Sequence, residues 1–294
     1  MAVEIAESHA RAPAAARRGG RAGRVGLAAL LALCSGTVLT FLALPIVALF
    51  AEIPIASLPA LLSDPVVLSA LEVTARTNAI ANVLILALGT PLAYLLATKR
   101  FAGRSLVVTL VELPLVLPPA VAGIGMLAAF GAGGLFGDDL KHAGIVLPFS
   151  QWAVVLAVTF VASPFYIRQA ITAFEAVDPA LTDAARTLGA GPGRTFWRVS
   201  LPLATAGLIA GWVLAFARGV GEFGATIVFA GNVHGRTQTL TLAVYEQLDG
   251  NFDIALAIGI LLVVLSGAVL LSYKLIASWK DSTSPSSALF GRSS

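Results

Sequence analysis

The chain has 294 residues with a mean hydropathy of +0.89, and only 12% of its residues are charged. This composition excludes an ordinary soluble domain, in which about 25% of residues are charged. The net charge of +3 is too small to indicate a nucleic-acid surface, so no nucleic-acid partner is expected. The composition predicts an all-α integral membrane protein.

Six apolar runs are long enough to cross a bilayer, which takes about 20 residues. In chain order the predicted spans are 26–50, 70–97, 106–132, 151–174, 201–230 and 254–277. We therefore expect one transmembrane domain over residues 25–277. Residues 1–24 are rich in Ala, Gly and Arg and have little to bury, so we expect a basic, disordered tail there. Residues 278–294 form a second predicted tail.

The distribution of basic residues predicts the orientation in the membrane. Most Lys and Arg residues fall on one side of the predicted layout, in the two tails and in two loops. They are Arg11, Arg17, Arg18, Arg21, Arg24, Lys99, Arg100, Arg104, Arg168, Arg186, Arg194, Arg198, Lys274, Lys280 and Arg292. The opposite side holds only Lys141 and Arg236. The positive-inside rule therefore predicts that both termini and the loop after span 151–174 are cytoplasmic.

No resident metal or nucleotide site is expected from the sequence. Cys34 is the only cysteine, so neither a disulfide nor a Cys-based metal site is predicted. The three histidines lie far apart along the chain and show no metal-ligand spacing. No glycine precedes a lysine, so the phosphate-binding motif G-x-x-x-x-G-K-S/T is absent. If ATP is used, we expect it to bind on another chain.

Prolines cluster in the third predicted span, at Pro114, Pro118 and Pro119. Each removes an intrahelical hydrogen-bond donor, so the helix is predicted to kink or break there. Broken backbone at membrane depth is tolerated where it is buried or lines an aqueous cavity. Two interpretations follow, a gate-forming helix that lines a pathway and a static kink that improves packing.

The loop between the fourth and fifth spans, residues 178–202, predicts a short amphipathic helix at the membrane surface. Asp178 is placed to cap it and Pro179 occupies its first position, where the missing N–H costs nothing. Gly189 is placed to end it in a left-handed turn. Such a helix is too short to be stable alone and needs a surface to dock on. The residues at helical spacing are Leu181, Ala184, Ala185 and Leu188.

This loop resembles the cytoplasmic motif of permease subunits of bacterial ATP-binding-cassette importers, which reads E-A-A, three residues, G, nine residues, I-x-L-P. Here Asp183-Ala184-Ala185 is followed by Gly189 and, nine residues later, by Val199-Ser200-Leu201-Pro202. Asp replaces Glu and Val replaces Ile, and both changes are conservative. The resemblance implies a coupling helix that inserts into a cleft of an ATPase subunit. Its implied residues are Asp183, Ala184, Ala185, Gly189, Leu201 and Pro202.

Several further segments resemble molybdate permeases in particular. They are residues 112–119, 187–190, 214–218, 221–226 and 237–240, and the similarity runs through most of residues 70–275. Sulfate and thiosulfate permeases share the fold, the coupling loop and a version of the Gly-Glu-Phe-Gly segment that begins at Gly221. The resemblance therefore implies molybdate as cargo, with sulfate, thiosulfate or tungstate as the alternative.

Charged residues in the fifth span have two interpretations. Arg218 and Glu222 stand four residues apart, so we expect them to share a helix face and to form a salt bridge that fixes a transmembrane dimer. Alternatively, Arg218 lies near the cytoplasmic mouth and guides a divalent oxyanion. Thr226 either lines the same route or packs as a buried hydroxyl. Arg168, near the inner end of the fourth span, is interpreted as an interface anchor.

The resemblance implies the fold and the partners. It implies the type I importer permease fold with six transmembrane helices, in the cytoplasmic membrane of a bacterium. The expected assembly is a homodimer of this chain, two ATPase subunits that carry ATP and Mg, and an extracytoplasmic oxyanion-binding protein. The chain itself is expected to be non-catalytic and to hold no cofactor.

The sequence disfavours two other functional classes, an ion-coupled secondary transporter and a membrane-embedded enzyme. An ion-coupled secondary transporter needs titratable groups near the midplane and usually internal repeats. No repeat is evident, and the deep carboxylates are limited to Glu72, Glu112 and Glu222. A membrane-embedded enzyme is disfavoured because no Ser/His, H-E-x-x-H or paired-aspartate arrangement occurs within the spans.

Overall fold

The computed structural model describes residues 14–282, in which the only regular secondary structure is helical. The chain divides into two units, one up to Pro54 and one from Ile55 onward. Within the described residues, five helices are long and apolar enough to cross a membrane, and a bent pair of helices brings the total to six. The all-α, six-span prediction is therefore confirmed.

The first unit is one helix, α1 (Ala14–Glu52). It contains the first predicted span, but it begins well before residue 26. Residues 14–24, predicted to be disordered, are helical, because alanine and arginine are strong helix formers. The rest of that predicted tail, residues 1–13, lies outside the described residues, as do residues 283–294 of the C-terminal tail.

The second unit is a bundle of long helices with short helices at its ends and side. Its elements are η1 (Ile55–Ser57), α2 (Leu58–Leu62), α3 (Pro65–Thr98), α4 (Arg104–Val116), α5 (Pro119–Phe130), α6 (Gly137–His142), α7 (Gln151–Glu175), α8 (Pro179–Thr187), α9 (Pro192–Thr195), η2 (Phe196–Ser200), α10 (Leu201–Val220), α11 (Gly224–Phe229), α12 (Leu240–Gly250) and α13 (Phe252–Ser282).

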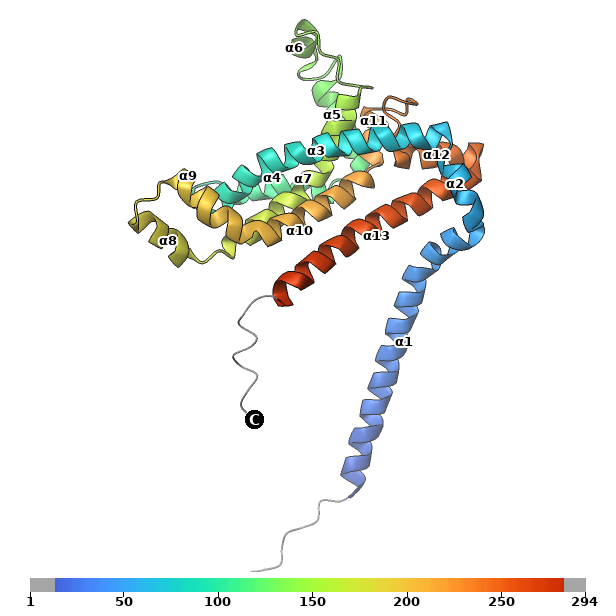
Figure 1. The fold of residues 1–294 in the computed structure, drawn as a ribbon, viewed down its shortest axis with the longest axis vertical. Coiled ribbons are helices and arrows are strands. Elements are labelled where there is room, and N and C mark those ends of the chain that lie inside the picture. The colour runs from blue at the N-terminus through green and yellow to red at the C-terminus, as the bar shows by residue number, and fades with distance from the viewer. Residues whose placement is uncertain (1–13, 283–294) are drawn as a thin grey trace, which may run out of the picture. The chain divides into compact units, whose positions relative to one another are not determined.

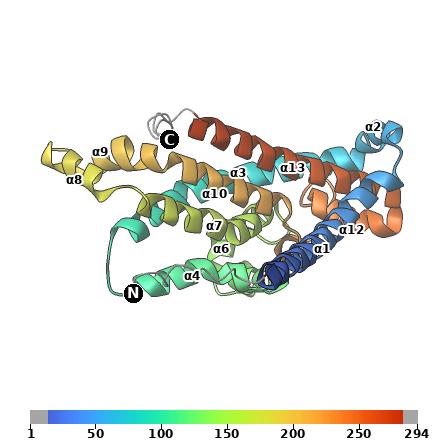
Figure 2. The same cartoon turned by 90° about the horizontal axis from the view of Figure 1, so that it is seen from below.

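Helices α3, α7 and α10 form the centre of this bundle, and α13 packs along α10 (Figure 1). We call the end that carries α8 and α9 the connector end, and the end that carries α2 and α12 the far end (Figure 2). Small residues bring the central helices together, as expected for membrane helices. A side chain at Gly207 would place its Cβ 2.5 Å from the Cβ of Ala173. Helices α10 and α7 can therefore approach this closely only because residue 207 is a glycine.

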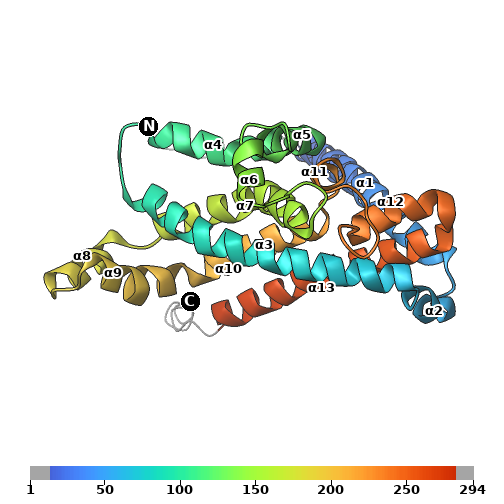
Figure 3. The same ribbon diagram turned by 90° about the horizontal axis from the view of Figure 1, so that it is seen from above.

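The third predicted span is broken between α4 and α5, which meet at a bend of 117°. Leu117 and Pro118 between them both have ψ of 130°. A residue that precedes proline is pushed out of the helical region of backbone conformation. Here Leu117 precedes Pro118, and Pro118 itself precedes Pro119. The predicted kink is thus confirmed as a complete break: α5 projects from the bundle in Figure 1, and α4 and α5 lie along one edge of it in Figure 3.

The bent pair still carries the chain across the bundle. Arg104 at the start of α4 pairs with Glu175 at the end of α7 at 2.9 Å, so both lie at the connector end. The start of α7 lies at the opposite end of that helix, where Phe149 N–H donates to the Phe229 carbonyl at 3.3 Å. The crossing between α3 and α7 is therefore supplied by α4 and α5.

The fifth predicted span differs at both ends from 201–230. The helix begins at Pro192 and runs without interruption through η2, a π turn, to Val220. The N–H of Leu201 donates to the Phe196 carbonyl five residues back. Pro202, expected to mark the start of the span, lies within this continuous helix, where the wider π turn accommodates its missing donor. The far part of the predicted span is the separate short helix α11.

Candidate functional site

Helix α8 forms as the local sequence predicts. Asp178 accepts the N–H of Ala180 at 2.9 Å and Pro179 is the first helical residue. Gly189 follows the helix with a φ of +83°, a conformation that favours glycine. The N–H groups of Gly189 and Ala190 donate back to carbonyls of the last turn, at 2.9 and 3.0 Å, which completes a Schellman cap.

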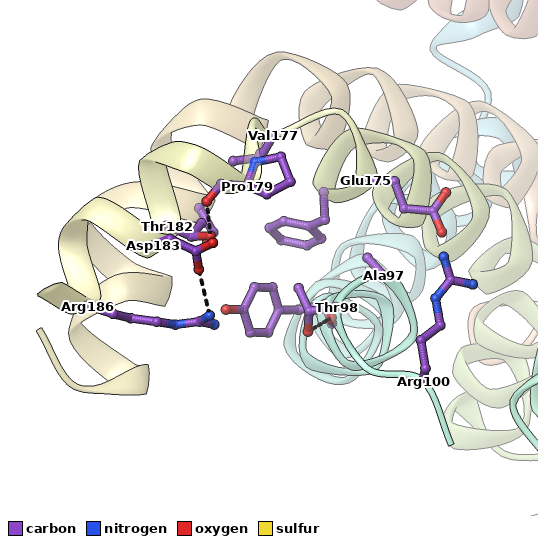
Figure 4. A pocket seen from close by; sticks show the side chains of 12 residues that line it. Ala97, Thr98, Arg100, Glu175, Val177, Pro179, Thr182, Asp183 and Arg186 are labelled. Atoms are coloured by element: carbon purple, nitrogen blue, oxygen red, sulfur yellow. Dashed lines mark hydrogen bonds and ion pairs between the residues drawn. The ribbon is translucent and has the colours of Figure 1, made fainter. Parts of the chain in front are cut away.

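The two faces of α8 are reversed relative to an ordinary surface helix. Its polar face, with Thr182, Asp183 and Arg186, lines a cavity of about 510 Å³ between α8 and the bundle (Figure 4). Asp183 and Arg186 pair at 3.1 Å on this face. The apolar face points away from the bundle, with Leu181 48% and Leu188 88% exposed. Because exposed apolar surface is costly, this face is suited to dock a partner.

Residues of the predicted coupling set divide between these faces. Ala184 is exposed beside Leu181 and Leu188, and Ala185 is half-buried at the edge of the same face. Asp183 lies on the polar face with the cavity behind it. Leu201 and Pro202 are not part of α8 and belong to the continuous helix that begins at Pro192.

An aromatic cluster closes the bundle behind α8. The rings of Tyr94, Phe174 and Phe196 come from α3, α7 and η2. Their centroids lie 5.3 Å apart for Tyr94 and Phe174 and 4.8 Å apart for Tyr94 and Phe196, both edge-to-face. Such pairs stabilise beyond simple burial, so the ends of three helices next to α8 are held together.

The predicted Arg218–Glu222 ion pair is present at 2.7 Å, within one chain. It does not sit on one continuous helix, because α10 ends at Val220 and Glu222 lies in the break before α11. The Glu222 side chain is 1% exposed, and its Oε1 accepts the N–H of Ala225 at 2.8 Å. The carboxylate thus satisfies an orphan donor in the first turn of α11 while it holds Arg218.

Arg218 lies far from α8 along its own helix. Arg218 lies in the last turn of a helix that starts at Pro192 next to α8. At 1.5 Å per residue, the 26 residues between them span about 39 Å along the helix. Arg218 is therefore well separated from the connector end.

The break between α4 and α5 lies beside the break between α10 and α11. A Cβ on Gly224 would come 2.8 Å from the Cβ of Pro119, and one on Gly123 would come 2.9 Å from the Ala225 carbonyl oxygen. A cavity of about 100 Å³ at this place is lined by Pro119 and Arg218 among others. We call this cavity the break cavity.

The remaining pathway candidates lie outside the lining of the break cavity. Pro118 is the N-cap residue of α5, and Thr226 is fully buried in α11. No hydrogen-bond partner is found for the Thr226 hydroxyl among the described residues. The structure therefore groups Pro119, Arg218 and Glu222 at one place, with Pro118 and Thr226 on the elements that form it.

Sequence reasoning missed an ion pair between α4 and α7. Arg168 Nε lies 3.6 Å from Glu112 Oε1, and their side chains are 68% and 41% exposed. The sequence indicates a deep carboxylate at Glu112 and an interface anchor at Arg168, but nothing in it pairs residues on separate helices. In the described part of the chain, no group of three or more His, Cys, Asp or Glu residues is placed to hold a metal ion.

Comparison with known proteins identifies relatives of this chain. Residues 89–281 match the family described as "Binding-protein-dependent transport system inner membrane component". The "Molybdenum transport system permease protein ModB" of Mycobacterium tuberculosis is 43% identical over 233 residues, which cover 79% of this chain and 88% of the relative. The Escherichia coli K12 protein of the same name is 40% identical over 64% of this chain and 82% of its own length. The "Sulfate transport system permease protein CysT" of Escherichia coli K12 is 33% identical, over 73% of this chain and 77% of that relative.

Solved structures share the fold. A bacterial ABC transporter for import of the acidic polysaccharide alginate contains a chain that superposes with a TM-score of 0.71 at 17% identity, covering 89% of this chain and 98% of that chain. A chain of the MetNI methionine ABC transporter in inward-facing conformations gives 0.56 at 19% identity, over 72% of this chain and 94% of the other. The fold is that of type I ABC importer permeases. The chain is a multi-pass membrane protein that belongs to the family of binding-protein-dependent transport system inner membrane components.

Proposed function

We propose that this chain is the permease subunit of an ABC importer that moves molybdate across the cytoplasmic membrane of a bacterium. The assignment of molybdate as cargo is based on the 43% identity to a molybdenum permease over most of both chains. The observation that carries the mode of action is helix α8, whose apolar face is turned away from its own bundle.

In this proposal the apolar face of α8 docks into an ATPase subunit. Leu181, Ala184 and Leu188 provide a shallow apolar surface, and the small side chain of Ala184 permits close approach. The polar face borders the cavity that separates α8 from the bundle, as Figure 4 shows. ATP and Mg bind on the ATPase, and this chain contributes no catalytic group.

The proposed assembly contains two copies of this chain and two ATPase subunits. The connector end faces the cytoplasm, in agreement with the basic residues Arg186, Arg194 and Arg198 near α8, and both termini lie on that side. An extracytoplasmic oxyanion-binding protein delivers the anion at the far end. High-affinity recognition belongs to that protein, so this chain needs to provide only a weak path.

Transport then follows from movement of α8 between two global states. ATP-driven closure of the two ATPase subunits brings the two α8 helices together. The movement passes into the bundle by two routes, the aromatic cluster of Tyr94, Phe174 and Phe196 and the uninterrupted helix from Pro192 to Val220. The second route leads directly to Arg218, so a tilt of this helix displaces the break cavity.

Uptake of labelled molybdate tests the proposal. Cells that lack their own molybdate importer are supplied with this chain, its ATPase and its binding protein, and excess tungstate or sulfate is added in parallel. We expect ATP-dependent uptake that tungstate blocks and sulfate does not. Uptake of labelled sulfate with weak competition by molybdate would overturn the cargo assignment.

Sulfate is the second candidate cargo because a sulfate permease is 33% identical over 73% of this chain. Both anions are tetrahedral and divalent, so one set of donors can serve either. Uptake that persists when the ATPase is absent would instead support a secondary transporter and overturn the importer assignment.

A further inference from the structure

The break cavity is a largely apolar pocket that has a single arginine in its lining. It is lined by Pro114, Leu115, Pro119, Phe165 and Arg218, so residues of α4, α5, α7 and α10 all contribute. Its volume of about 100 Å³ exceeds the ~10–15 Å³ that a single water needs, so a small anion fits in it. Arg218 is the one charged residue in its lining.

The environment of Arg218 leaves donors free for an anion. A guanidinium carries five N–H donors, and the pair with Glu222 engages it through Nη2 at 2.7 Å. Glu222 is 1% exposed and fixed by the Ala225 N–H, whereas the Arg218 side chain is 27% exposed. The carboxylate therefore faces protein while the guanidinium also borders the cavity.

A second arginine lies one helical turn from this cavity, toward the connector end. Arg168 follows Phe165 on the same face of α7, and Glu112 precedes Leu115 on the same face of α4. Three residues correspond to about 4.5 Å along a helix. Because α4 runs away from the connector end and α7 runs toward it, both members of the Arg168–Glu112 pair are displaced in the same direction.

The Arg168–Glu112 pair is poorly explained as a stabilising contact. Its atoms are 3.6 Å apart and both side chains are well exposed, a geometry that contributes little to stability. Ionisable residues within membrane-spanning helices are costly and mark ion and substrate pathways. The exposed Arg168 within a candidate span is therefore available for a role besides anchoring at the interface.

We propose that the break cavity and Arg168 are two successive binding stations for the transported oxyanion. This inference rests on the proposed function and names the residues that the transported anion contacts on its path. The anion first contacts Arg218 in the break cavity and then Arg168, and each carboxylate competes with it as a counterion. The competition keeps both stations weak, which a conducting site requires, because an anion that binds too tightly does not leave.

Transport by variants of the complete complex tests the second station. Arg168→Gln is expected to lower the uptake rate by about tenfold or more, because one charge-assisted contact with the anion is lost. The matched control is Arg104→Gln, since Arg104 also forms an ion pair between α4 and α7, at 2.9 Å, but lies at the connector end, eight residues before Glu112 on α4. Arg168→Lys retains the charge and is expected to restore most of the uptake. Equal losses in both glutamine variants, or no loss in Arg168→Gln, would overturn the proposal.

Cysteine protection tests the cavity without depending on transport. Leu115→Cys is introduced with Cys34→Ala, and the complex is labelled with a small thiol reagent in increasing molybdate. We expect molybdate to slow the labelling of this cysteine. The double variant Arg218→Gln with Glu222→Gln avoids an unpaired buried charge and is expected to abolish the protection. Molybdate-independent labelling in the otherwise unaltered complex would overturn the proposal.

These outcomes separate the inference from the proposed function. A complex with the native chain that takes up no molybdate contradicts the proposed function. Normal uptake by that complex together with normal uptake by Arg168→Gln leaves the function intact and removes only the two-station path. Copurification of each variant with the ATPase confirms that the bundle has folded.

Discussion

The connector region and the two helix breaks are built on opposite principles. Helix α8 is short, exposed and defined by contacts within a few residues, from the Asp178 cap to the Gly189 turn. The breaks between α4 and α5 and between α10 and α11 depend on contacts between distant segments, such as Gly224 against Pro119. A locally encoded element can be displaced as a unit, whereas the breaks hold one geometry only while their neighbours stay in place.

This difference agrees with the proposed division of work. The connector has apolar surface to offer a partner and few contacts that resist its movement. The break cavity has one arginine, Arg218, in a lining that is otherwise apolar. We therefore expect substitutions at the connector to affect coupling, and substitutions at the breaks to affect stability or the path of the anion.

The largest effect is expected from Ala184→Trp on the exposed face of α8. The indole fills the surface that is proposed to enter the ATPase, so uptake should be abolished while membrane insertion is unchanged. A surface substitution of this kind usually changes stability by less than ~0.5 kcal/mol. Ala184→Ser, which preserves the small size, should transport normally. Normal uptake by a well-expressed Ala184→Trp complex would remove Ala184 from the docking face.

We expect the same result for Ala185→Trp, because Ala185 lies at the edge of that face. Its half-buried position adds a possible clash within the chain, so its expression level must be compared with that of Ala184→Trp. Loss of uptake in Ala184→Trp alone would place the docking contact on the side of Leu181 and Leu188.

A smaller effect is expected from Gly123→Ala, which tests the close packing of α5 on α11. The new methyl would lie 2.7 Å from the Val228 Cβ and 2.9 Å from the Ala225 carbonyl oxygen. Overpacking of this kind costs about 1–3 kcal/mol. Gly125→Ala on the same helix meets nothing within 4 Å and serves as the control.

The measurement is the thermal unfolding midpoint of the solubilised complex. Gly123→Ala should lower the midpoint, whereas Gly125→Ala should leave it unchanged or raise it, because alanine favours a helix over glycine. Equal midpoints for the two variants would contradict the packing described for the breaks.

The smallest effect is expected from Asp178→Ala, which removes the cap of α8. Loss of an N-cap costs about 1 kcal/mol, so α8 should fray and uptake per ATP hydrolysed should fall a few-fold. Asp178→Asn keeps a capping oxygen and should retain nearly all of the activity. Identical uptake by the alanine and asparagine variants would show that the helix is held by its partner and not by its cap.

The sequence was most informative where structure depends on near neighbours. Asp178, Pro179 and Gly189 predicted the bounds of α8, and consecutive prolines at positions 118 and 119 predicted the break in the third span. In both cases the cause lies within two or three residues, through capping or through the steric effect of proline on the residue before it.

Features that depend on distant segments were missed or misplaced. The pairing of Glu112 with Arg168 requires knowledge of how α4 packs on α7. Neither the π turn after Phe196 nor the start of the helix at Pro192 is evident from hydropathy, so the distance of Arg218 from α8 could not be predicted. The helical start of α1 at Ala14 shows that low hydrophobicity alone is a weak guide to disorder in an Ala- and Arg-rich segment.

Photo-cross-linking from α8 in the complete complex tests the central claim most directly. A benzoyl-phenylalanine is placed at Leu188, which is 88% exposed on the apolar face, or at Thr182, which lines the cavity behind α8. We predict an adduct with the ATPase from position 188 and none from position 182. An adduct from position 182 alone, or from neither position in a complex that transports, would contradict the account.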